Sequence, residues 1–292
     1  MTEIELVKKL RDDTGVGIMD CKKALKEASG DLELAKTLLR KKGLSLALQK
    51  TDRKTKEGVT AIYIKGNKRA GTVIELNSET DFVARNEKFQ KLAQDIVENS
   101  ASCNNIQDCK NFQLPSGKII QEEIDNNIAV MGENISLRRI EQVKVDNGIV
   151  SSYVHNTVAP NIGKIAVLVA LQSDINQEKL SILGANIAMH IAASKPIALN
   201  TSEVPTDLIE KEKNIFIEQA RSTGKPESVI NKMVDGRIHK FLEEIVLLEQ
   251  VFIIDGKTKI SEVVNNYAKE LGSPIKITKF VRFEVGEDIE ET

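Results

Sequence analysis

Residues 58–89 read GVTAIYIKGNKRAGTVIELNSETDFVARNEKF, and this stretch decides the fold class. Apolar and polar residues alternate in GVTAIYI (58–64) and in AGTVIEL (70–76), which is the pattern of half-buried β-strands. A Gly-Asn pair between the two runs favours a tight turn, so a β-hairpin is predicted. A helix follows, with one apolar face made of Phe89, Leu92, Ala93 and Ile96. A hairpin followed by an amphipathic helix predicts an α+β fold.

The same order of elements occurs again further along the chain. In the first half a helix near residues 119–131 precedes a closing strand, SLRRIEQVKV (136–145). The second half offers two hairpin strands, two helices and a closing strand in VSSYVHN (150–156), GKIAVLVAL (163–171), LSILGANIAMHIAAS (180–194), SEVVNNYAKELG (261–272) and IKITKFVRFEV (275–285). This repetition predicts two related α+β subdomains with antiparallel sheets.

The pattern of apolar residues in 1–48 predicts a small domain of three helices. Thr2 and Glu5 have the spacing of a capping box at the start of the first helix. The inner faces of the three helices are predicted to be Ile4, Val7 and Leu10; then Cys21, Ala24, Leu25 and Ala28; then Leu34, Ala35, Leu38 and Leu39. We expect Gly43 to end the third helix, because glycine commonly follows the last helical turn.

The remaining chain divides into a linker, two subdomains and an insertion. Residues 49–57 are polar and rich in Lys and Arg, which is typical of a linker. The first core subdomain is predicted at 58–146 and the second at 147–292.

The insertion lies at about residues 204–250, within the second subdomain. Leu208, Ile215 and Ala220 lie on its first helix, a turn follows at 222–226, and the second helix carries Val234, Ile238, Phe241 and Ile245 at heptad spacing. This pattern predicts an inserted antiparallel coiled-coil hairpin. Its apolar seam would be available to a partner and would permit weak self-association.

Composition excludes several classes of protein. The chain has 292 residues, of which 41% are hydrophobic and 29% charged, with a net charge of −2. No run approaches the roughly 18 apolar residues of a bilayer-spanning helix, and the balanced charge is typical of a globular protein. Three cysteines do not make a disulfide framework. Because the first residues also lack the apolar core of a signal peptide, a cytoplasmic location is predicted.

The residue types give little support to enzymatic chemistry. The three histidines, at 155, 190 and 239, stand in no metal-binding motif, and His190 within an apolar helix is typical of a core residue. Residues 66–72, GNKRAGT, lack the lysine that a phosphate-binding loop needs after its second glycine. We therefore expect no catalytic residue, metal or other cofactor, and no nucleotide bound by the chain itself.

Two alternative functions follow from the charge distribution and from one cysteine. Residues 1–56 carry a net charge of +5 and the rest −7, so an RNA-binding accessory protein would use the Lys and Arg residues between Lys36 and Lys56. The same count fits a solvated helical surface. A thiol enzyme would use Cys21, which lies among charged residues near a helix start. The position of Cys21 in the apolar stripe of its helix favours a buried structural thiol instead.

Two segments carry a resemblance to a known family. LRDDTGVGIMDCKKAL (10–25) and ELNSETDFVARNEKF (75–89) resemble the signature stretches of the elongation factor Ts family, the guanine-nucleotide exchange factors of elongation factor Tu. Weaker similarity continues through residues 186–196, 222–241 and 281–287, so nearly the whole chain is covered. The resemblance implies a ubiquitin-associated-like (UBA-like) head, a two-part core and an inserted coiled coil. It also implies elongation factor Tu as the partner, GDP-bound or nucleotide-free, with no direct nucleic-acid or membrane partner.

The resemblance also implies roles for particular residues. The loop that, in the family, enters the GTPase domain of the partner and dislodges Mg²⁺ matches Thr80, Asp81, Phe82 and Val83. The head residues that match contacts to the GTPase domain are Arg11, Ile18, Met19 and Lys22, and a contact to a second partner domain matches His155. Taken without the resemblance, Phe82 is typical of a core anchor, Asp81 of a helix N-cap, Met19 of a helix-packing residue and His155 of a solvent-facing strand end.

Overall fold

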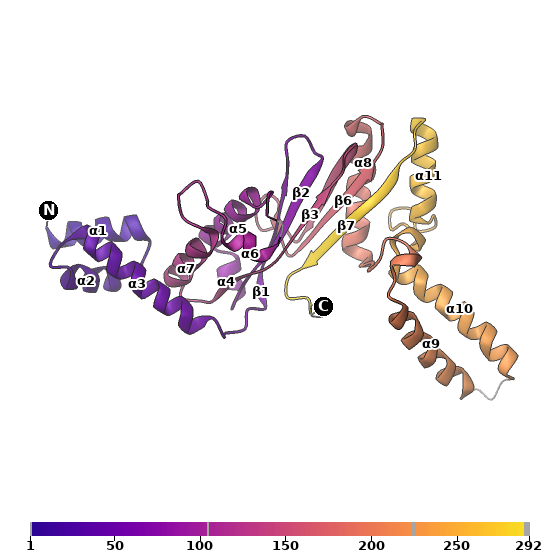
Figure 1. The fold of residues 1–292 in the computed structure, drawn as a ribbon, viewed down its shortest axis with the longest axis horizontal. Coiled ribbons are helices and arrows are strands. Elements are labelled where there is room, and N and C mark those ends of the chain that lie inside the picture. The colour runs from indigo at the N-terminus through magenta and orange to yellow at the C-terminus, as the bar shows by residue number, and fades with distance from the viewer. Residues whose placement is uncertain (1, 104, 223–225, 289–292) are drawn as a thin grey trace.

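Two antiparallel sheets packed face to face form the centre of the computed structural model, which describes residues 2–103, 105–222 and 226–288 (Figure 1). One sheet has the strand order β3-β2-β1-β5, with bounds Ile135–Lys144, Ala70–Ser78, Glu57–Ile64 and Ile162–Gly163. The other has the order β4-β6-β7, with bounds Gly148–His155, Ile165–Gln172 and Lys276–Glu284. The predicted α+β class with antiparallel sheets is confirmed.

Each sheet buries both of its faces. Side chains from alternate positions of the two sheets meet in one apolar layer that includes Ile62, Val73, Val143, Leu168, Val281 and Phe283. Helices cover the two outer faces: α4 (Asp81–Ala84), α5 (Glu87–Asn99), α6 (Ile106–Lys110) and α7 (Ile120–Met131) on one side, α8 (Gln177–Ser194) and α11 (Ile260–Leu271) on the other. The centre of the molecule is therefore a helix, sheet, sheet, helix sandwich.

The two halves of this core share one topology, as the repeated order of elements predicted. In each half the first two strands form an antiparallel pair, and the closing strand pairs with the second of them. Both closing pairs shift register at corresponding points, between Glu75 and Leu76 and between Ala170 and Leu171. Near these bulges lie Gly58 and Gly148, with φ angles of 138° and 132°. A Cβ added to Gly58 would come within 2.2 Å of the Leu76 carbonyl oxygen, and one added to Gly148 within 2.0 Å of that of Leu171. Both positions therefore favour glycine.

Strand β5 links the two halves. It follows β4 in sequence but pairs with β1 in the sheet of the first half, through Thr60 opposite Gly163 and Ala61 opposite Ile162. The Thr60 hydroxyl also donates to the Gly163 carbonyl at 3.0 Å. The division of the core after residue 146 stays a prediction, and this strand crosses it.

The head consists of α1 (Glu3–Thr14), α2 (Ile18–Glu27) and α3 (Leu32–Lys50). The capping box between Thr2 and Glu5 is present, and the predicted inner face of α2 is buried, with Cys21 wholly inaccessible. The prediction that Ile4 and Leu34 lie on the inner faces of their helices was wrong, because these residues are 81% and 49% exposed. A small domain buries a smaller fraction of its surface than a large one, so some periodic apolar residues of the head face solvent.

The prediction that Gly43 ends the third helix was also wrong. Helix α3 continues through Gly43 to Lys50, so it runs from the head into the predicted linker. Gly43 lies where an added Cβ would be 3.0 Å from the Cβ of Ala129 on α7, and Ala47 belongs to the apolar core of the first subdomain. An ion pair of 2.7 Å joins Arg40 to Glu122 across the same contact. The glycine permits close helix packing here rather than a helix end.

The insertion forms two helices, α9 (Thr206–Arg221) and α10 (Glu227–Ile245), which lie side by side and extend away from the sheets (Figure 1). Near the sheets, the packed apolar residues include Leu208, Ile209, Leu242 and Ile245; further out they include Phe216, Ile217, Ala220, Ile230, Val234 and Ile238. Ile215, expected in this seam, is 38% exposed instead. Residues 223–225 of the predicted turn lie outside the described part of the chain.

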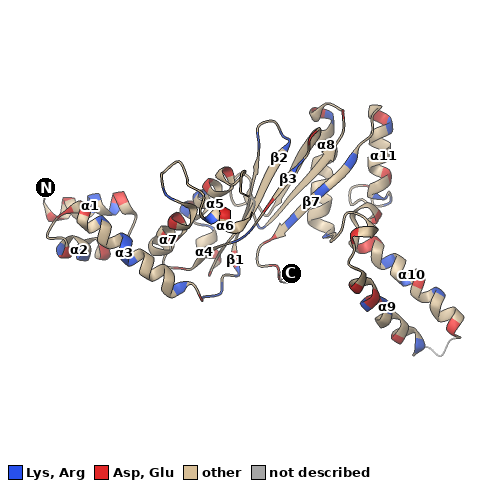
Figure 2. Ribbon diagram, in the orientation of Figure 1, with Lys and Arg blue, Asp and Glu red and all other residues tan. Residues whose placement is uncertain are grey.

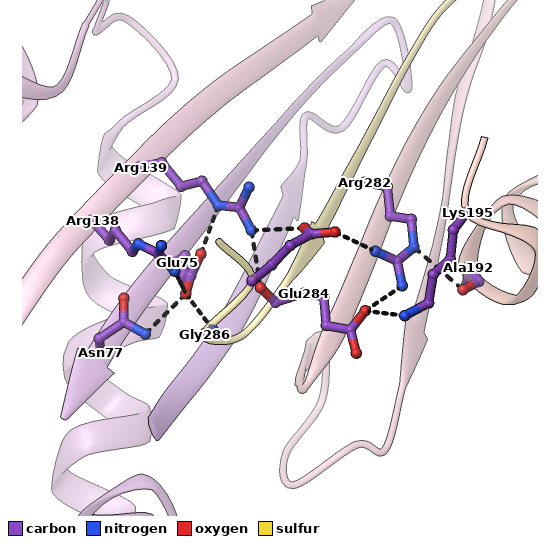
Figure 3. A network of polar contacts seen from close by, with 10 residues as sticks. Glu75, Asn77, Arg138, Arg139, Ala192, Lys195, Arg282, Glu284 and Gly286 are labelled. Atoms are coloured by element: carbon purple, nitrogen blue, oxygen red, sulfur yellow. Dashed lines mark hydrogen bonds and ion pairs between the residues drawn. The ribbon is translucent and has the colours of Figure 1, made fainter. Parts of the chain in front are cut away.

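A buried carboxylate joins the end of the chain to the first sheet (Figure 3). Glu75 on β2 is inaccessible to solvent and lies between the sheets. It accepts hydrogen bonds from Arg139 Nε at 2.6 Å, Arg138 at 3.2 Å, the Asn77 amide at 2.9 Å and the Gly286 N–H at 2.9 Å. The Arg139 guanidinium also donates to the Glu284 carbonyl at 2.9 Å. These contacts fix the end of β7 and the two residues after it, 285–286, against β2 and β3.

We predict that Glu75→Ala lowers the free energy of unfolding by about 3 kcal/mol, because removing one member of a buried ion pair leaves its partners with unsatisfied charge. Urea unfolding followed by circular dichroism measures the change. The matched control is Glu141→Ala, whose carboxylate pairs with Lys279 at 2.5 Å in a half-exposed position. That variant should lose less than about 1 kcal/mol. Equal losses for the two variants would contradict the structural role of Glu75.

Candidate functional site

The loop at residues 80–83 lies where strand β2 ends and the one-turn helix α4 begins. Thr80 is the N-cap residue, with φ −127° and ψ 159°, but its side chain does not bond the helix backbone. Its hydroxyl donates to Glu133 Oε1 at 2.6 Å, and its N–H donates to Glu133 Oε2 at 2.9 Å. The Ser78 hydroxyl donates to the Thr80 carbonyl at 2.9 Å. The loop is therefore held at its first residue through both backbone and side chain.

Phe82 points into solvent, with 82% of its surface exposed. Within the single turn of α4, Val83 and Ala84 take the core-facing positions and are 8% and 2% exposed. Phenylalanine is among the residues most often buried, so an isolated ring on a well-anchored turn is unusual. The alternative interpretation of Phe82 as a core anchor is wrong.

Asp81 lies at the rim of a cleft of about 420 Å³. Its carboxylate makes an ion pair of 2.9 Å with Arg85 and remains 43% exposed. The cleft is also lined by Asn156, Val158 and Lys164, which follow β4 in sequence. The alternative interpretation of Asp81 as an N-cap was wrong, since Thr80 holds that position. The fold thus brings the loop and the segment after His155 to one cleft.

Sequence reasoning missed the turn that braces the loop. Besides the two bonds from Thr80 to Glu133, the Asn134 N–H donates to Glu79 Oε1 at 2.7 Å. The antiparallel pairing of β2 with β3, once recognised, places this turn beside the loop. Ile135 opens β3 opposite Ser78, the last residue of β2, so the residue pair before β3 must lie beside the loop after β2.

The four head residues surround the start of α2. Ile18 and Met19 are 51% and 65% exposed, and Arg11 and Lys22 are also exposed. The loop before α2 places the apolar pair on the surface, because Cys21, Ala24 and Leu25 occupy the inner face of that helix. The alternative of a helix-packing Met19 is wrong. These residues lie at one end of the elongated molecule, well away from α4 in the view of Figure 1.

His155 is the last residue of β4 and is exposed, as the strand-end alternative expected. Its Nδ1 lies 3.2 Å from the hydroxyl of Tyr153, and the two rings stack with centroids 6.1 Å apart. The His155 carbonyl accepts from the Lys164 N–H at 3.0 Å. The imidazole is thus presented from a fixed strand end next to the segment that lines the Asp81 cleft.

The chain is similar to known proteins over nearly its whole length. A family model described as Elongation factor TS matches residues 79–287. The chain belongs to the elongation factor Ts family. It is 56% identical to "Elongation factor Ts" of Orientia tsutsugamushi (strain Boryong) over 288 residues, which cover 98% of this chain and 93% of that protein. Proteins with the same name from Rickettsia peacockii (strain Rustic) and Rickettsia bellii (strain OSU 85-389) are 48% and 47% identical, covering 99% and 100% of this chain and 95% of each relative.

Membership in the elongation factor Ts family implies nucleotide exchange on elongation factor Tu during translation elongation. Within residues 2–103, 105–222 and 226–288, no three His, Cys, Asp or Glu side chains gather as metal ligands would. No helix among the same residues combines the length and apolar character that a membrane span requires.

The three cysteines are buried thiols. Burial raises the pKa of Cys21, whose Sγ donates to the Val16 carbonyl at 3.5 Å inside the head. Burial also raises the pKa of Cys103 to about 12 and raises that of Cys109, whose Sγ lies 3.0 Å from the Ser100 hydroxyl. A high pKa keeps a thiol protonated and unreactive at neutral pH. The prediction that Cys21 is a buried structural thiol is confirmed. Its inaccessible, protonated thiol does not support the alternative of a thiol enzyme.

Four of the eight basic residues from Lys36 to Lys56 form ion pairs within the chain, namely Lys36, Arg40, Lys42 and Arg53. Lys36 contacts Asp13 at 3.0 Å, Lys42 contacts Asp20 at 2.6 Å, and Arg40 pairs with Glu122 as described above. Figure 2 shows acidic and basic residues interspersed along α1–α3. Paired and mixed charges of this kind give a solvated helical surface rather than the continuous basic stripe that binds a phosphate backbone.

His190 is a core residue, as predicted. It is inaccessible on α8, its Nε2 lies 2.9 Å from Gln250 Oε1, and its Nδ1 accepts from the Ile253 N–H at 3.3 Å. Burial lowers the pKa of His190, because the imidazolium loses hydration inside the core. His190 therefore ties α8 to the loop before α11 in its neutral form.

This lowered pKa predicts a pH dependence of stability. Below about pH 6.5 the unfolded chain takes up a proton at this histidine that the folded chain does not, so stability falls as the pH drops and is fully present above that value. Between pH 7 and 5.5 the wild type should lose up to about 1 kcal/mol more unfolding free energy than His190→Asn. Urea unfolding at both pH values measures the difference, and identical losses would rule out the assignment.

Proposed function

We propose that the chain binds elongation factor Tu with GDP, displaces Mg²⁺ and GDP through residues 80–83, and leaves when GTP binds. The observation that carries the proposal is the exposed Phe82 on a braced turn, in a member of the elongation factor Ts family. The chain acts by binding alone, and we assign no covalent step, metal or cofactor to it.

Phe82 supplies part of the free energy of exchange. Burying a phenylalanine side chain contributes about 1.5–3 kcal/mol, and each 1.4 kcal/mol is a factor of ten in an equilibrium. If the ring enters the partner only when GDP and Mg²⁺ are loosened, it favours the nucleotide-free state by one or two orders of magnitude. Linkage makes the effect reciprocal, so GDP weakens the binding of this chain by the same factor.

Asp81 adds an electrostatic effect beside the ring. Mg²⁺ bridges phosphate oxygens in nucleotide sites and neutralises their charge. A half-exposed carboxylate on the same turn as Phe82 reaches the partner together with the ring. Its negative charge disfavours the return of the nucleotide phosphates. Thr80 and Val83 hold this turn, one through Glu133 and the other through the core.

Two further surfaces complete the proposed contact. The head residues Arg11, Ile18, Met19 and Lys22 contact the GTPase domain, and His155 contacts a second domain of the partner. Support comes from the exposure of Ile18 and Met19 and from the rigid strand end that presents His155. An exposed methionine suits a protein contact because its flexible thioether adapts to the facing surface.

The finer architecture belongs to the same proposal. We infer that residues 1–48 are a UBA-like domain and that α9 and α10 form an antiparallel coiled-coil hairpin. Support for the coiled coil comes from the apolar contacts along both helices and from Arg237, which donates to Gln219 at 2.7 Å across them. The hairpin permits weak self-association, and the chain works in the cytoplasm with its partner.

We predict that Phe82→Ala slows GDP release from elongation factor Tu at least tenfold at a fixed concentration of the chain, since the ring no longer stabilises the nucleotide-free partner. Release of a fluorescent GDP analogue measures the rate. Ile182→Ala is the matched control, because Ile182 is 63% exposed on α8, outside the proposed contact. Wild-type exchange by the Phe82 variant would refute the assigned role of this ring.

We predict that the double variant Ile18→Ala, Met19→Ala weakens binding to nucleotide-free elongation factor Tu about tenfold, because two exposed apolar side chains no longer bury surface. Isothermal titration calorimetry gives the dissociation constant. Ile4→Ala is the control, since Ile4 is 81% exposed on the same head but outside the proposed set. An unchanged dissociation constant for the double variant would remove the head from the contact.

A further inference from the structure

The turn between α7 and β3 contacts two chain segments, one that directly precedes the exposed Phe82 and one at the end of α3. On one side lie Glu79 and Thr80, which precede Phe82 in sequence. On the other side lies the end of α3 and the chain after it: the Asn134 side chain donates to the carbonyls of Thr51 at 3.3 Å and Arg53 at 2.9 Å. The Lys50 ammonium donates to the Gly132 carbonyl. Residues 132–134 therefore form a junction between the head and the loop.

Glu133 makes the most specific contact in this junction. Its two carboxylate oxygens accept from two groups of one residue, the hydroxyl and the backbone N–H of Thr80. Hydrogen bonds to an ionised group are short and strong, and a two-point contact fixes direction as well as distance. Because Thr80 precedes Asp81 and Phe82 directly, fixing Thr80 sets the direction in which the loop leaves β2.

The second carboxylate of the junction supports the first. Glu79 Oε1 accepts from the Asn134 N–H at 2.7 Å and lies 3.4 Å from Arg53. Asn134 is 6% exposed, so its bonds are shielded from water. The loop and the junction are thus joined in both directions, by Glu133 to Thr80 and by Glu79 to Asn134.

The core does not need Glu133 to keep α4 in place. Val83 and Ala84 are buried in the apolar core of the first subdomain, on the C-terminal side of Phe82. Without the Glu133 carboxylate the turn keeps this anchor and the Ser78 bond to the Thr80 carbonyl, and it loses the two-point contact at the Thr80 hydroxyl and N–H. Thr80, Asp81 and Phe82 would then sample several directions while the fold persists.

We propose that Glu133 is a positioning residue for exchange: it holds Thr80 so that Phe82 and Asp81 are presented to the partner in their binding orientation. The inference rests on the proposed function, because it assumes that Phe82 acts on the partner. Preorganisation of this kind lowers the ordering cost of binding.

The test compares variants of the full-length chain in the fluorescent-GDP release assay with elongation factor Tu. Glu133→Ala should reduce the apparent second-order rate constant of exchange five- to tenfold. Glu133→Gln should recover most of the activity, since its Oε1 still accepts from the Thr80 N–H while its Nε2 donates to the Thr80 hydroxyl. The matched control Glu98→Ala removes an exposed carboxylate that accepts from the Gln94 amide at 2.8 Å, and it should exchange like the wild type.

A double-variant cycle separates positioning from general stability. If Glu133 acts through the loop, Glu133→Ala should change exchange less than twofold in a Phe82→Ala background. A full five- to tenfold further loss in that background would overturn the inference, as would wild-type exchange by Glu133→Ala alone. A Phe82→Ala chain with wild-type exchange would instead defeat the proposed function itself, so the two failures are distinguishable.

Discussion

The structure depends on a charge buried between two sheets. Glu75 lies on the strand β2, which pairs with both β1 and β3, and its carboxylate binds two arginines of β3 and the backbone just after β7. The last strand of the chain is thereby fixed to the first sheet. The same strand β2 ends at Ser78 and leads directly into the loop. This buried contact, together with the apolar layer between the sheets and the pairing of β5 with β1, sets the position of Phe82 relative to the second half of the core.

An exposed ring on a rigid turn is what an exchange factor needs. A flexible loop would lose ordering entropy on binding, whereas a turn held by Glu133 on one side and by Val83 and Ala84 on the other loses little. The cleft beside Asp81 is lined both by this loop and by the chain that follows His155. The proposed contact of the head lies at the far end of the molecule, so in this proposal binding extends over a long surface.

Periodicity and order of elements predicted the fold well, and the exceptions have physical reasons. The alternating strands, the helix from Phe89 to Ile96 and the repeated topology all follow from local patterns. The prediction of a helix end at Gly43 failed because this glycine packs closely against Ala129, which lies 86 residues away in sequence. The prediction of burial failed for Ile4, Leu34 and Ile215. A periodic apolar stripe in the sequence does not show which part of it a neighbouring helix covers. The site residues came from resemblance, and local pattern alone favoured a buried Phe82. Glu133 was missed because its role appears only when β3 is paired with β2.

The central claim is that this chain opens the nucleotide site of elongation factor Tu. The most direct measurement is the rate at which elongation factor Tu releases a fluorescent GDP analogue in excess Mg²⁺, with and without the chain. The account predicts that release accelerates with chain concentration to a plateau and that raising Mg²⁺ slows the accelerated rate. A release rate that does not change at any chain concentration would contradict it.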